Sequence, residues 1–118
     1  MKVLIIEKER ELLYALERLL KSKGYEVIPT FDGVQGYESV INESPDVVVI
    51  GVEIPRISAE EIAVRARKNG DIALILVCRD KEELTLKENG KILFDGLLAL
   101  PFTPSELFDC INKAVRTK

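Results

Sequence analysis

The residues in this chain that could do chemistry come directly after apolar runs. Glu7 and Lys8 follow one run, residues 3–6, and Glu53 comes shortly after another, residues 47–50. In an open α/β sheet, the loops at the carboxyl ends of the strands are where ligands bind and reactions occur. Lys8 and Glu53 can form an ion pair there, or Glu53 and Glu7 can hold a cation weakly. The alternative for Glu53 is an ordinary solvated loop acid.

A thiol ends a further apolar run, because Cys78 closes residues 72–78. Cysteine in such a position can be redox-active where a cation lowers its pKa, or it can be a small buried filler. Cys78 and Cys110 have no metal-like spacing. Two isolated cysteines in a chain without an export signal indicate a reducing compartment, so we expect a cytoplasmic location.

Several function classes are excluded by what the sequence lacks. There is no histidine, which excludes a histidine nucleophile, a phosphohistidine carrier and a Ser-His-Asp triad. No glycine-rich phosphate loop follows any apolar run. The net charge of −3 is spread over mixed acids and bases, which argues against a nucleic-acid surface. No apolar run is long enough to span a membrane.

The most telling element is the β-branched run Val47–Ile50, which is apolar on both faces. Such a run is typical of a central strand in a parallel sheet that helices cover on both sides. Pro45 precedes it and Pro55 follows it, and neither can lie within a central strand. The strand must therefore end near Gly51, which offers no side chain to the loop that follows.

The rest of the chain alternates between strands and helices. Four more strands are predicted, at residues 3–6, 25–29, 72–78 and 97–100, and Pro29 makes the second of these an edge strand. Apolar spacing and capping signals predict helices between Leu12 and Gly24, between Gly33 and Ser44, from Ala59 to Lys68 and after Thr103. The charged segment Asp80–Gly90 is predicted to be a short exposed helix. This alternation predicts one α/β domain over residues 1–118, with a parallel sheet and right-handed crossovers.

Several short motifs together indicate a resemblance to a known protein family. They are the opening strand Lys2–Ile6, the sequence GYEV at residues 24–27, Asp32-Gly33, Pro45-Asp46, Pro55, and Pro101-Phe102 followed by residues 104–107. In this order and at this spacing, they resemble the receiver domain of bacterial two-component response regulators over essentially the whole chain. The resemblance implies a flavodoxin-like (βα)5 three-layer sandwich with strand order 2-1-3-4-5.

The chemistry of that family is phosphoryl transfer from a kinase's phosphohistidine to an aspartate at the end of the third strand. A magnesium ion held by two acids assists, and a hydroxyl and a lysine bind the phosphoryl oxygens. Every one of these positions is altered here. The acceptor is replaced by Gly51, the acidic pair by Glu7 and Lys8, the hydroxyl residue by Cys78 and the lysine by Leu100.

These replacements predict a pseudo-receiver that is not phosphorylated on aspartate and is not an enzyme. We expect no catalytic residue, no metal and no cofactor. The Lys8 ammonium takes roughly the place of the metal charge, so the site can be an internally neutralised cluster; the alternative is drift after the chemistry was lost. Gly51 also argues against a permanent phosphate mimic, which would carry an acid there.

The resemblance further implies a protein partner, either a signalling protein or an attached effector domain, and no contact with nucleic acid or membrane. In receivers that switch, the fourth helix, fifth strand and fifth helix meet the partner. The corresponding positions here are Glu82, Leu84, Leu97 and Leu107, and Leu97 takes the place of the aromatic switch residue. A different hypothesis is a small flavodoxin-like domain that binds a nucleotide or metabolite at the ends of the strands. The chain can be free-standing or the first part of a longer regulator.

Overall fold

The sheet of the domain has five parallel strands. A computed structural model of the chain describes residues 1–79, 87–88 and 91–118. The strands are β1 (Lys2–Ile6), β2 (Glu26–Thr30), β3 (Val47–Gly51), β4 (Ala73–Cys78) and β7 (Gly96–Ala99). Their order is β2-β1-β3-β4-β7, and every neighbouring pair is parallel. This confirms the predicted order 2-1-3-4-5, and β2, which contains Pro29, is an edge strand.

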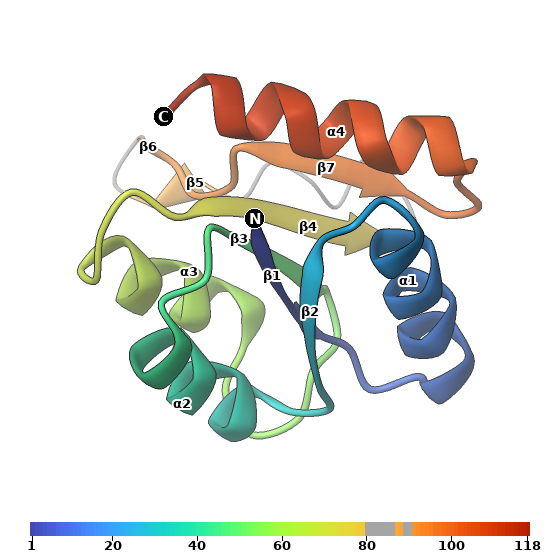
Figure 1. Cartoon of the computed structure of the whole chain (residues 1–118). Coiled ribbons are helices and arrows are strands. Elements are labelled where there is room, and N and C mark those ends of the chain that lie inside the picture. The colour runs from blue at the N-terminus through green and yellow to red at the C-terminus, as the bar shows by residue number, and fades with distance from the viewer. Residues whose placement is uncertain (80–86, 89–90) are drawn as a thin grey trace.

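Helices cover both faces of this sheet, as Figure 1 shows. They are α1 (Arg10–Ser22), α2 (Gly33–Glu43), α3 (Ala59–Arg67) and α4 (Pro104–Arg116). Helices α1 and α4 pack on one face, and α2 and α3 pack on the other. Within the described residues, none of the helices combines the length and the apolar character that crossing a membrane requires.

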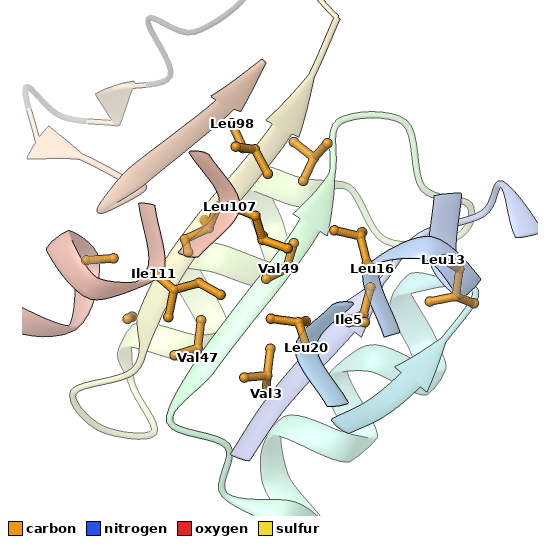
Figure 2. Packing of buried hydrophobic residues seen from close by; sticks show 14 residues of the cluster. Val3, Ile5, Leu13, Leu16, Leu20, Val47, Val49, Leu98, Leu107 and Ile111 are labelled. Atoms are coloured by element: carbon orange, nitrogen blue, oxygen red, sulfur yellow. The ribbon is translucent and has the colours of Figure 1, made fainter. Parts of the chain in front are cut away.

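The side chains of each strand alternate between two cores. In β1, Val3 and Ile5 point to the α1/α4 face, whereas Leu4 and Ile6 point to the α2/α3 face. Strand β3 is buried along its whole length. Figure 2 shows the first core, in which leucine and isoleucine side chains of α1 and α4 meet the valines of β1 and β3. The period of two residues therefore decides which side chains can meet at the end of the sheet.

The helices begin and end where local signals predict. The Asp32 carboxylate accepts a hydrogen bond from the backbone of Gln35 at the start of α2. Thr103 caps α4 in a capping box with Glu106. Gly24, at φ 85°, follows the end of α1 in the left-handed region that favours glycine. The caps at Asp32 and Thr103 satisfy backbone N–H groups that the first helical turn leaves without partners.

The segment between β4 and β7 differs from the expectation. Residues 80–86 and 89–90 of the predicted helix Asp80–Gly90 lie outside the described residues. At Lys87–Glu88 the helix prediction is wrong, because these residues form β5, which pairs antiparallel with β6 (Lys91–Ile92). An Asn-Gly pair lies between the two strands in the sequence, and this pair is a typical hairpin signal.

Candidate functional site

The pairing of β1 with β3 brings Glu7 and Gly51 together. Strand β1 ends in register with β3 at the pair Ile6 and Ile50, so Glu7 and Gly51 are the next neighbours across the two strands. Gly51 in turn pairs with Val77 of β4. By the period of two, all three positions point to the α1/α4 face of the sheet.

The Glu7 carboxyl occupies the space beside Gly51. A Cβ atom added to Gly51 would collide with Oε1 of Glu7. The other oxygen, Oε2, accepts a hydrogen bond of 2.8 Å from the backbone N–H of Glu9. Only 6% of Glu7 is exposed. Gly51 has no side chain, and the carboxyl of Glu7, the residue after β1, therefore fills the space beside it.

Burial sets the protonation behaviour of this carboxyl. Removal from water raises the pKa of Glu7 above its ordinary value, and the nearby charge of Glu9 adds to the rise. Backbone hydrogen bonds from Glu9 and Lys8, and the charge of Lys8, act in the opposite direction. Because burial is the largest influence, the ionised form of Glu7 costs stability at neutral pH.

Two ion pairs lie around this carboxyl. Lys8 Nζ is 3.3 Å from Glu53 Oε2, which is the loop pair considered from the sequence. Arg79 Nη2 is 2.6 Å from Glu9 Oε1, a contact that the sequence did not indicate. All four side chains are largely exposed, so each pair contributes about 0–1 kcal/mol to stability. The buried Glu7 carboxyl therefore matters more to the local structure than either pair.

The residues around Glu7 form a small pocket of about 60 Å³. It is lined by Glu7, Lys8, Glu9, Leu12, Val52, Glu53, Val77, Cys78, Arg79 and Leu100. The structure thus brings together four of the altered positions, with Gly51 beside them. Cys78 is 1% exposed, with its Sγ 3.8 Å from the carbonyl oxygen of Leu98. This burial favours a packing role, since reactive thiols are partly exposed.

The side chains at this pocket do not suit magnesium. Mg²⁺ needs hard oxygen ligands in near-octahedral geometry. Here one Glu7 oxygen is taken by a backbone amide and the other faces Gly51, while the ammonium of Lys8 holds Glu53. Within the described residues, no three Asp, Glu, Cys or His side chains come together as a metal site. No chemical step at this site can therefore be assigned to a bound metal.

The predicted partner surface is only partly exposed. Leu97 on β7 is 45% exposed and lines a groove of about 350 Å³ between β7 and α4. Leu107 is fully buried, so the prediction that it lies on this surface was wrong. The reason is helical spacing, which turns Leu107 together with Ile111 towards the sheet (Figure 2). Glu82 and Leu84 lie outside the described residues.

A second charged cluster, at the opposite end of the sheet, is not evident from the sequence. Asp95 accepts a hydrogen bond of 2.8 Å from the backbone N–H of Leu74. Its oxygens also lie 3.2 Å from Arg67 Nη2 and 2.9 Å from Lys118 Nζ. Burial alone would raise the pKa of Asp95, but these hydrogen bonds and charges outweigh it and lower the pKa below its ordinary value. No spacing in the sequence brings these four distant residues together.

Comparison with known proteins decides the family. The family model of the response regulator receiver domain matches residues 3–112. The chain belongs to the response regulator receiver domain family. The transcriptional regulatory protein DltR of Streptococcus agalactiae is 31% identical over 98% of this chain and 52% of its own length. Response regulator MprA of Mycobacterium avium is 30% identical over 98% of this chain and 51% of its own length.

A solved structure supports the same assignment. The response regulator receiver domain protein from Clostridium thermocellum has a TM-score of 0.85 at 25% identity, and the match covers 98% of this chain and 94% of that one. The chain spans about half the length of the two regulators named above. The receiver fold is thus present over nearly the whole chain, with a glycine where the resemblance places the phosphoacceptor.

Proposed function

We propose that this receiver domain works without aspartyl phosphorylation and acts by binding another protein. It would catalyse no reaction of its own and would hold no metal or cofactor. One observation carries the proposal: Gly51 ends β3 without a side chain, and the Glu7 carboxyl fills the space beside it. A phosphoryl group has neither an acceptor nor room there.

The replaced neighbours support the same proposal. Phosphoryl transfer depends on positioning and on neutralising the charge of the moving group. Lys8 is paired with Glu53 at the rim, and Leu100 presents an apolar wall to the pocket. The chain has two isolated cysteines without a metal-like spacing, and on this ground we propose a reducing cytoplasm as the location.

The size of the pocket argues against the alternative of a nucleotide or metabolite site at the strand ends. Sites for such ligands usually enclose about 300–1,000 Å³. The pocket around Glu7 has about 60 Å³, enough for a few water molecules. Its glutamates would also repel a phosphate group.

Phosphotransfer is tested by intact-protein mass spectrometry after incubation with acetyl phosphate and Mg²⁺. We expect no added phosphoryl mass, while a receiver domain that has an aspartate at the acceptor position gains it under the same conditions. Gly51→Asp is expected to stay unmodified as well, because Lys8 and Leu100 remain and Glu7 fills the space. A hydroxylamine-labile phosphoryl adduct on the unchanged protein would contradict the proposal.

Partner binding is tested at the exposed strand β7. Leu97 is 45% exposed, and Ile41 on α2 is a matched control at 51%. Affinity capture from the native cell should recover a specific partner with the wild-type domain and with Ile41→Arg. Leu97→Arg should lose it. Equal capture by both variants would place the partner surface elsewhere.

A further inference from the structure

The Glu7 carboxyl lies where a side chain at position 51 would have to lie. A Cβ atom at position 51 would collide with Oε1 at the far end of the flexible Glu7 side chain, so the Glu7 carboxyl would have to move. Glu7 cannot retreat without cost, because its other oxygen is bonded to the backbone of Glu9. Leu12, Val77 and Leu100 line the same pocket as Glu7 and make its walls apolar.

We propose that the Glu7 carboxyl occupies the space that a side chain at position 51 would need, and that it thereby holds the β1–α1 loop over the end of β3. We call this arrangement the lock. The carboxyl joins the two elements directly: it lies against Gly51 and accepts the Glu9 N–H at the N-cap of α1. Glu7 is thus a positioning residue, which holds the loop carrying Lys8 and Glu9 in the arrangement that their ion pairs require.

The charged groups around the pocket are consistent with this lock. Lys8 and Glu9 belong to the same loop as Glu7, Glu53 comes from the loop after β3, and Arg79 follows β4. Each of these four has an exposed partner among the others. Glu7 is the buried member, so its displacement would act first on its own loop, through the Glu9 N–H.

A double-mutant cycle tests the lock. Gly51→Ala adds one methyl group, and in the wild-type background we expect the melting temperature to fall by about 4 °C, because the displaced Glu7 carboxyl loses its hydrogen bond from the Glu9 N–H. In a Glu7→Ala background, the same change should cost less than about 2 °C, because the space is then open. If the Gly51→Ala variant does not fold, recovery of folding in the double variant with Glu7→Ala would equally support the lock.

Gly36→Ala is the matched control. Its added Cβ would collide with the apolar side chain of Ile6 on the other face of the sheet. Its loss of stability should therefore be the same whether residue 7 is glutamate or alanine. This separates a specific conflict with Glu7 from a general response to a methyl group near the sheet.

Amide hydrogen exchange at Glu9 gives a second readout. If Gly51→Ala displaces the Glu7 carboxyl, the Glu9 N–H loses its acceptor and should exchange faster than neighbouring amides. Equal destabilisation in both backgrounds, or no loss in the wild-type background, would overturn the proposal. Unchanged exchange at Glu9 in Gly51→Ala would also overturn it. These results are separate from phosphotransfer, since a domain without an acceptor can exist without such a lock.

Discussion

The two ends of the sheet both enclose a carboxylate, and the two carboxylates behave in opposite ways. At the amino end, Asp95 meets Arg67, Lys118 and the Leu74 amide, and its pKa is lowered. At the carboxyl end, Glu7 is enclosed beside Gly51 with one backbone amide, and its pKa is raised. The difference lies in the partners, because cations and hydrogen bonds outweigh burial at Asp95 but not at Glu7.

One of the two carboxylates therefore stabilises the fold, and the other does not. The ionised Asp95 stabilises the fold, because it joins β4, the start of β7 and the ends of α3 and α4. The ionised Glu7 lowers stability, yet it lies at the carboxyl end of the sheet, where open α/β sheets bind ligands. A costly group at such a place is typical of residues retained for a reason other than stability.

The largest effect is expected at the amino end. Asp95→Asn should lower the free energy of unfolding by about 2–3 kcal/mol at pH 7, because Arg67 and Lys118 lose a charged partner. Urea denaturation measures this change. Since the folded pKa of Asp95 is lowered, its contribution is present above the ordinary value of 3.8 and is lost as the pH falls through the folded pKa.

Asp46→Asn is the control for that prediction. Asp46 also accepts a backbone hydrogen bond at the amino end, from the N–H of Lys2 at 2.8 Å, but it is exposed. Its replacement should cost less than about 1 kcal/mol. Equal losses of stability for Asp46→Asn and Asp95→Asn would show that the ion pairs of Asp95 add nothing to its contribution.

A smaller effect of opposite sign is expected at the carboxyl end. Glu7→Gln keeps an acceptor oxygen for the Glu9 N–H and removes the buried charge, so the melting temperature at pH 7 should rise by a few degrees, since about 4 °C corresponds to 1 kcal/mol in a domain of this size. Because the folded pKa of Glu7 is raised, the wild type loses stability as the pH rises from 4.5 through that pKa. The gain from glutamine should therefore vanish below pH 4.5. A variant that is less stable than the wild type at pH 7 would mean that the ionised carboxylate stabilises the fold.

The smallest effect is expected at the exposed rim. Lys8→Gln breaks the pair with Glu53, whose side chains are 44% and 77% exposed, and should change stability by less than about 1 kcal/mol. Thermal unfolding at low and high salt checks this, because any effect should fade as salt screens the charges. A loss as large as that of Asp95→Asn would show that the rim, and not Glu7, holds this end together.

Most of the fold could be predicted because its signals are local. The valine run of β3, the proline in β2 and the caps at Asp32 and Thr103 each depend on a few neighbouring residues. The helix prediction at Lys87–Glu88 was wrong because it depended on charged composition, which is a weak signal without apolar periodicity.

The site could be predicted only in part. Their positions at the ends of two predicted parallel strands were enough to place Glu7 and Gly51 at the same end of the sheet. That the carboxyl lies over the glycine depends on packing between strands that are distant in sequence. The Asp95 cluster was missed for the same reason, since its partners come from three separate segments.

The most direct test of the central claim is a high-resolution crystal structure of the protein grown with Mg²⁺ and beryllium fluoride, an analogue of a phosphoryl group. We predict that the Glu7 carboxyl lies against Gly51 and accepts the Glu9 N–H, with neither metal nor fluoride bound there. A magnesium ion held by Glu7 and Glu53, with the analogue seated at the end of β3, would contradict the account.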